Sequence, residues 1–153
     1  MFHAMTPDAA DTGLLQLVDA AMAYGQGRYQ HLVVPANVSV ESELSAACYL
    51  WLTAFCSKER ARDFLQDAAT YAHQLNVLLP VACRDLGVMR LPEHLVGTLN
   101  RLRKLRNDVV HRGKLKDPLD RTTSAELLAA ALFALHYIAM FRSELEAQSG
   151  VAG

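Results

Sequence analysis

The chain has 153 residues, of which 52% are apolar and 20% are charged, and its formal net charge at pH 7 is −1. This composition excludes a disordered chain, and the length suffices for one domain with its own hydrophobic core. We therefore expect a single domain over residues 1–153, with a core from about residue 7 to 147 and a flexible tail at 148–153.

The three cysteines, Cys48, Cys56 and Cys83, lie in apolar runs and lack the close spacing of zinc ligands. They predict reduced core cysteines and no resident metal or cofactor. No basic leader precedes an apolar run at the N-terminus. The longest nearly apolar stretch, 127–141, is short for a bilayer span and contains His136. We expect a soluble, cytoplasmic protein without a membrane partner.

Capping residues and apolar spacing predict helices along most of the chain. Thr6-Pro7-Asp8 is a typical start for a first helix, which carries an apolar face from Leu14 to Met22 and ends near Gly25. Pro35 interrupts a β-branched run, so we interpret 28–38 as an extended connector. Ser39 is expected to open a helix to about residue 55, and Ser57 is expected to cap the next, which extends to about residue 72.

Three further helices complete the predicted all-α fold, a bundle of about five or six helices. A short one covers about 76–86, and a longer one begins after Leu91-Pro92 and ends at Gly113. Thr123 and Glu126 form a capping-box pattern before the last helix, expected to reach about residue 148. This helix is apolar on nearly all sides, so it must lie at the bundle centre or in a subunit interface.

Basic residues concentrate in one segment of this near-neutral chain. Seven of the 15 Lys and Arg residues fall within 101–116, where Asp108 is the only acidic residue. Such a segment indicates either a localised anion site or a solvated helix face. Because Leu95, Leu99, Leu102, Leu105 and Val109 are spaced by three and four residues, the basic side chains are expected on the other side of the helix.

Within this segment, Arg103, Asn107 and His111 are spaced by four residues and share one helical stripe. Arg106 is offset, but its side chain is long enough to reach that stripe. An arginine binds phosphate oxygens through a planar fork, and a histidine exchanges protons near neutral pH. An asparagine can orient the histidine or donate to a developing negative charge. These groups suffice for metal-independent RNA cleavage by attack of the ribose 2′-hydroxyl, and no acidic cluster for Mg²⁺ accompanies them.

A purely structural interpretation of the same residues is also open. Cations in the last turns of a helix offset the negative end of its dipole, which accounts for His111 and Arg112 without any ligand. Asp108 and Arg112 have the spacing of an intrahelical ion pair, which would stabilise the helix end.

The string LRNDVVHRGK, residues 105–114, resembles the signature of the HEPN superfamily, an Arg followed by four to six residues and then a His. Arg106, Asn107 and His111 match it, and Arg112-Gly113-Lys114 and the helix opening with Thr123 and Glu126 are similar to members of that superfamily. The resemblance in architecture covers about residues 10–147. It implies a helical bundle that dimerises, with two copies of the motif at the edges of a shared cleft.

Many HEPN proteins are metal-independent endoribonucleases of toxin–antitoxin or antiviral defence systems, and others bind RNA, nucleotides or proteins without cleaving. The resemblance therefore implies catalytic roles for Arg106, Asn107 and His111. RNA would be attracted by Arg103, Lys104, Arg112 and Lys114, and an antitoxin or defence protein is a further candidate partner. The alternative is a non-catalytic helical module for dimerisation, or for RNA or protein binding. A small-molecule or nucleotide-binding bundle has no supporting motif such as a glycine-rich phosphate loop.

Overall fold

Helices make up most of the described chain in the computed structural model, which describes residues 9–151 and the side chains of 12–150. Their bounds are α1 Ala9–Gly25, α2 Tyr29–Leu52, α3 Lys58–Asp67, α4 Tyr71–His73, η1 Gln74–Leu78, α5 Leu79–Leu86, α6 Glu93–Arg112 and α7 Arg121–Val151. Since α4, the π-helical turn η1 and α5 follow without a break, there are six helical segments, and no strand occurs between residues 9 and 151. The predicted all-α fold with five or six helices is confirmed.

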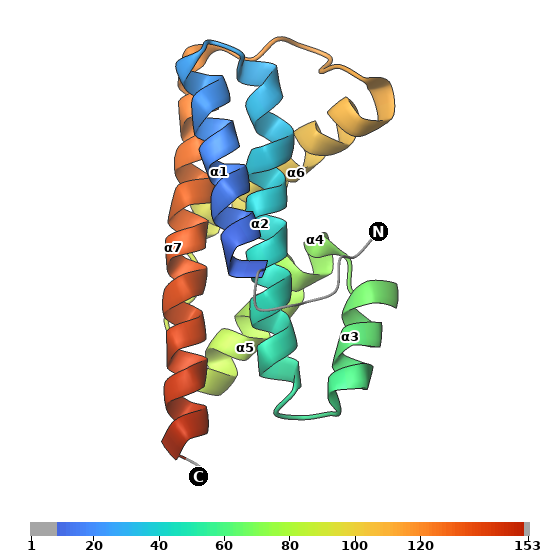
Figure 1. Cartoon of the computed structure of the whole chain (residues 1–153), viewed down its shortest axis with the longest axis vertical. Helices are drawn as coiled ribbons and strands as arrows, with labels where there is room; N and C mark the ends of the chain where they lie inside the picture. The colour runs from blue at the N-terminus through green and yellow to red at the C-terminus, as the bar shows by residue number, and fades with distance from the viewer. Residues whose placement is uncertain (1–8, 152–153) are drawn as a thin grey trace.

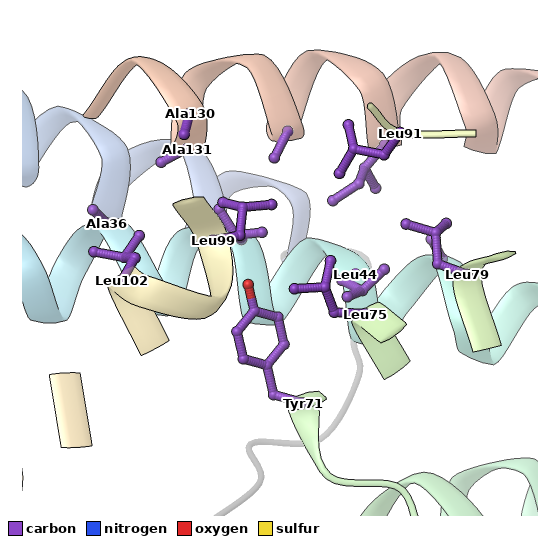
Figure 2. Packing of buried hydrophobic residues seen from close by; sticks show 14 of the residues in the cluster. Ala36, Leu44, Tyr71, Leu75, Leu79, Leu91, Leu99, Leu102, Ala130 and Ala131 are labelled. Atoms are coloured by element: carbon purple, nitrogen blue, oxygen red, sulfur yellow. The ribbon is translucent and has the colours of Figure 1, made fainter. Parts of the chain in front are cut away.

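Helix α2 is the centre of the bundle. Figure 1 shows α1 and α7 running alongside it, α6 crossing behind it, and α3 standing apart beside its C-terminal half. The largest fully buried side chains come chiefly from α2, η1, α6 and α7, and several of them are labelled in Figure 2. They include Leu32, Val33, Val40, Leu44, Leu75, Leu99, Leu102 and Leu127.

Residues 29–38 belong to α2, so the predicted extended connector is wrong. Pro35 lies inside the helix and removes one backbone donor. Leu32, Val33 and Ala36 on the same stretch are fully buried, at helical spacing. The burial of this face offsets the local cost of the proline, which sequence rules alone weigh more heavily. Ser39, expected as a cap, is buried mid-helix, and its hydroxyl donates to the carbonyl oxygen of Ala36 at 2.8 Å.

Helix α1 ends at Gly25 as predicted, but a different face points inward. Leu17, Ala20 and Ala23 are buried against the bundle, whereas most of the large apolar residues on the predicted face are exposed, namely Leu14, Leu15, Val18 and Met22. Small residues therefore form the contact face, which permits a close approach between helices. The predicted cap at Thr6-Pro7-Asp8 lies outside the described residues.

The middle of the chain is divided differently from the prediction. Ser57 caps α3 as expected, its hydroxyl accepting from the Arg60 backbone N–H at 3.3 Å. The helix ends at Asp67 rather than near residue 72, and Thr70 caps the following segment. This segment is helical from Tyr71 to Leu86, and its π-turn immediately precedes the α-helix in which Pro80 occupies the first turn. A wider turn before a proline accommodates the missing backbone donor.

Helix α6 has the predicted boundaries, with Pro92 before it and Gly113 at its C-cap in the left-handed conformation, φ +71°. Only glycine adopts this conformation at little cost, so the helix stops there. The start of α7 differs from the prediction, because Asp120 rather than Thr123 supplies the cap. Its Oδ1 accepts from the Thr123 backbone N–H at 2.7 Å. This bond lowers the pKa of the Asp120 carboxyl.

Helix α7 continues to Val151, three residues past the predicted end, and is more than twice as long as the apolar stretch at 127–141. Residues Arg121–Gly150 are long and apolar enough to cross a membrane by length and composition alone. The same helix supplies core side chains, including Leu127, Ala131 and Ile138. As predicted, the cysteines are free, with Cys48 and Cys83 buried and Cys56 partly exposed.

Candidate functional site

The C-terminal half of α6 carries all the residues of the predicted site up to Arg112. In Figure 1 this half extends past α2, away from α7, and the loop after Gly113 returns across the end of the bundle to α7. That loop is attached to α2 through the backbone N–H of Leu115, which donates to Oε1 of Gln30 at 3.5 Å. The fully buried Leu99 and Leu102 hold the same helix in the core. The candidate site is therefore placed by a long anchored helix.

Arg103 and Arg106 lie partly buried beside the core rather than on the fully solvated side of α6. The Nε atom of each is buried and has no hydrogen-bond partner among the described residues. No carboxylate among the described residues forms an ion pair with the guanidinium of Arg103 or Arg106. Two positive charges with unpaired hydrogen-bond donors reduce the stability of the ligand-free protein, and both features favour the binding of an anionic ligand.

Asn107 is paired with Arg106 instead of His111. Nη1 of Arg106 donates to Oδ1 of Asn107 at 3.2 Å. The asparagine thus orients the arginine, and its Nδ2 remains as a donor for a ligand oxygen. His111 lies one turn later at the exposed end of the helix. Within residues 12–150, it has no hydrogen-bond or ion-pair partner, so its ring nitrogens are accessible to solvent and to a substrate.

The predicted pair between Asp108 and Arg112 is present, with Oδ1 and Nε 3.8 Å apart. Both side chains are exposed, 37% and 65% respectively, so the pair contributes little to stability. Lys104 and Lys114 are exposed to solvent. Because Asp108 points to Arg112, it does not neutralise Arg103 or Arg106, and the site keeps an excess of positive charge.

A group of buried and partly buried polar side chains near Arg103 was not predicted. Asn37 and Glu41 are one turn apart on α2, and Nδ2 of Asn37 donates to Oε2 of Glu41 at 3.2 Å. Tyr71 begins α4 and directs its hydroxyl into the core toward α6 (Figure 2). Burial raises the pKa of Tyr71, the charge of Glu41 raises it further, and the charge of Arg103 lowers it. Glu41 and Arg103 therefore each lie within electrostatic reach of Tyr71.

Asn37, Glu41 and Tyr71, together with Arg103, are called the polar junction below. Oδ1 of Asn37 and the hydroxyl of Tyr71 are buried and lack hydrogen-bond partners among the described residues, as does Nε of Arg103. Buried polar groups are usually paired, so these three unpaired atoms make the junction a candidate for function. Asn37 inside an apolar helical run is the one sequence signal that pointed here, and the expectation of a connector concealed it.

Two cavities lie elsewhere. One of about 340 Å³ lies among α1, α2 and α7. Its lining includes Glu43 and Arg142, whose Oε2 and Nη1 atoms are 3.1 Å apart. Burial raises the pKa of Glu43, and Arg142 only partly opposes this. The other, of about 220 Å³, is lined by residues of η1, α5 and α6. Neither cavity includes the residues Arg103–His111, and no group of three His, Cys, Asp or Glu side chains within the described chain is arranged to hold a metal ion.

Comparison with known proteins adds no relative to this description. No protein-family model matches the sequence, and no curated protein or solved structure is significantly similar to it.

Proposed function

We propose that the chain acts on RNA and is a metal-independent endoribonuclease of the HEPN type, cytoplasmic and of the toxin or antiviral-defence class. The observation that carries the proposal is the state of Arg103 and Arg106. Both present buried, unpartnered donors and unneutralised charge on the helix that also bears Asn107 and His111. A phosphodiester would supply the missing acceptors and the missing negative charge.

The proposed reaction uses each of these groups once. His111 takes the proton of a ribose 2′-hydroxyl while the 2′-oxygen attacks the adjacent phosphorus. Arg106, oriented by Asn107, binds the phosphate oxygens as negative charge accumulates on them. The bond from phosphorus to the 5′-oxygen then breaks, and that oxygen takes up a proton, leaving a cyclic 2′,3′-phosphate. A second His111, from another copy across a shared cleft, is the natural donor of this proton, which is why the proposal includes a homodimer.

Salt dependence of RNA binding tests the proposal before any cleavage is sought. With about four phosphate contacts, the association constant for single-stranded RNA should fall roughly 50-fold between 50 and 200 mM salt. Arg106→Ala should weaken binding and make this dependence less steep, whereas Arg60→Ala, on the distant α3, should change neither. The measurement is fluorescence anisotropy of labelled RNA in EDTA. Absence of binding at 50 mM salt would refute the RNA-directed function.

The runner-up function, a helical interaction module, is favoured by an exposed apolar face on α1 and α7. Seven large apolar side chains on these two neighbouring helices are between 47% and 63% exposed, namely Leu14, Leu15, Val18, Met22, Leu132, Phe133 and Met140. Patches of this kind mark protein contacts. In Figure 1, α1 and α7 lie on the other side of α2 from the C-terminal half of α6, which carries the motif. A dimer formed through this face would keep two separate sites, whereas a shared cleft requires contact through α6.

Phe133→Glu is expected to turn a dimer that uses the α1/α7 face into a monomer. Phe133 is 56% exposed, so a charge there is tolerated by the single chain but must be buried in the proposed contact. Phe64→Glu is the matched control, because Phe64 is 42% exposed on α3, outside this face. Light scattering after size exclusion measures the mass. A dimer that survives Phe133→Glu would exclude this contact and favour one through α6.

A further inference from the structure

The polar junction contains a hydrogen-bond donor and a hydrogen-bond acceptor that have no partner among the described residues. Arg103 Nε can only donate a hydrogen bond, and the Tyr71 hydroxyl oxygen can accept one. Both atoms are buried without partners among the residues described, on elements that face each other. Tyr71 is only 6% exposed, so its hydroxyl does not reach bulk solvent or a bound RNA. Any role that it has in the site must act through a neighbour.

We propose that Tyr71 is a positioning residue for Arg103, with its hydroxyl oxygen accepting the Arg103 Nε hydrogen when the outer nitrogens of the guanidinium hold a phosphate of the RNA. Asn37 and Glu41 are the members of the junction on α2, and the charge of Glu41 acts on Tyr71. This inference rests on the proposed function, because it requires Arg103 to contact RNA.

The geometry favours Tyr71 over the other members of the junction for this role. Glu41 already accepts the amide of Asn37 and does not form an ion pair with Arg103. A carboxylate in direct contact would neutralise the arginine and oppose phosphate binding, whereas a neutral hydroxyl fixes its orientation and leaves its charge intact. Burial and the charge of Glu41, which raise the pKa of Tyr71, keep the hydroxyl neutral at physiological pH.

A double-mutant cycle tests the inference. Tyr71→Phe, Arg103→Ala and the double variant are compared with the wild-type chain by RNA titration in EDTA at low salt, and their melting temperatures are recorded. Tyr71→Phe is expected to weaken RNA binding about five- to tenfold in the wild-type background and less than twofold in the Arg103→Ala background. Tyr49→Phe, a partly buried tyrosine of α2, is the matched control and should bind as the wild type does.

The positioning role of Tyr71 and the proposed RNA-directed function are contradicted by different results. If Arg103→Ala binds RNA as well as the wild type does, Arg103 does not contact RNA. The proposed function then loses one of the two arginines on which it rests. If Arg103→Ala weakens binding but Tyr71→Phe does not, the positioning role alone is wrong. Equal effects of Tyr71→Phe in both backgrounds would also overturn that role. Since phenylalanine keeps the packing of the ring, a purely structural tyrosine would show no coupling to Arg103.

Discussion

His111→Ala is expected to slow RNA cleavage in EDTA by at least about a hundredfold, the usual contribution of a general acid or base. The histidine lies at the exposed end of α6 and packs against nothing in the core, so the variant should fold normally. Single-turnover cleavage of a labelled, structured RNA measures the rate, and far-UV circular dichroism checks the helical content. Arg106→Ala is expected to slow cleavage at least as much, because it removes the stabilisation of the phosphate and the partner of Asn107.

His94→Ala provides the control for this experiment. His94 lies in the first turn of the same helix and is exposed, but it is far along α6 from the stripe. The His94→Ala variant should cleave RNA at the wild-type rate. If His111→Ala cleaves as fast as the wild type, His111 is not the proton-transfer group. If neither the wild-type chain nor His111→Ala cleaves RNA but both still bind it, a non-catalytic RNA-binding module describes the protein better.

The sequence predicted α6 correctly because its signals are local and agree with one another. Pro92 and Gly113 mark its ends, and apolar residues recur at helical spacing between them. For residues 29–38 the signals conflict, because the β-branched run and Pro35 oppose a helix. The helix forms because Leu32 and Val33 are fully buried in the core of the bundle, in which α1 and α7 pack against α2. That energy comes from contacts between distant segments, which no local rule contains.

In the candidate site, too, local features could be predicted from the sequence and tertiary features could not. The stripe of Arg103, Asn107 and His111 follows from spacing on one helix, and the structure keeps these residues on α6. The partial burial of Arg103 does not follow from spacing, because it depends on how α6 crosses α2 and where α4 begins. Tyr71 is 32 positions before Arg103, and only the tertiary fold brings them within electrostatic reach. The bond between Arg106 and Asn107 is local, but periodicity does not indicate which neighbour an amide will choose.

Leu99→Ala is expected to reduce the free energy of unfolding by about 2–5 kcal/mol, through lost transfer energy and the cavity left behind. Leu99 is fully buried where α6 crosses the centre of the bundle (Figure 2), and together with Leu102 it anchors the helix that carries the site. Urea denaturation followed by circular dichroism measures the change. For a domain of this size, such a loss is a large part of the total stability.

Val110→Ala, on the same helix, is the matched control, because it distinguishes a stability loss due to lost burial from one due to a change in helix propensity. Val110 is 53% exposed, and alanine favours a helix more than valine does, so this variant should stay within about 0.5 kcal/mol of the wild type. Equal losses in both variants would mean that Leu99 is not a core anchor and that α6 is held from another side. In that case Arg103 and Arg106 would not be fixed beside the core, and α6 would not hold a preorganised phosphate site.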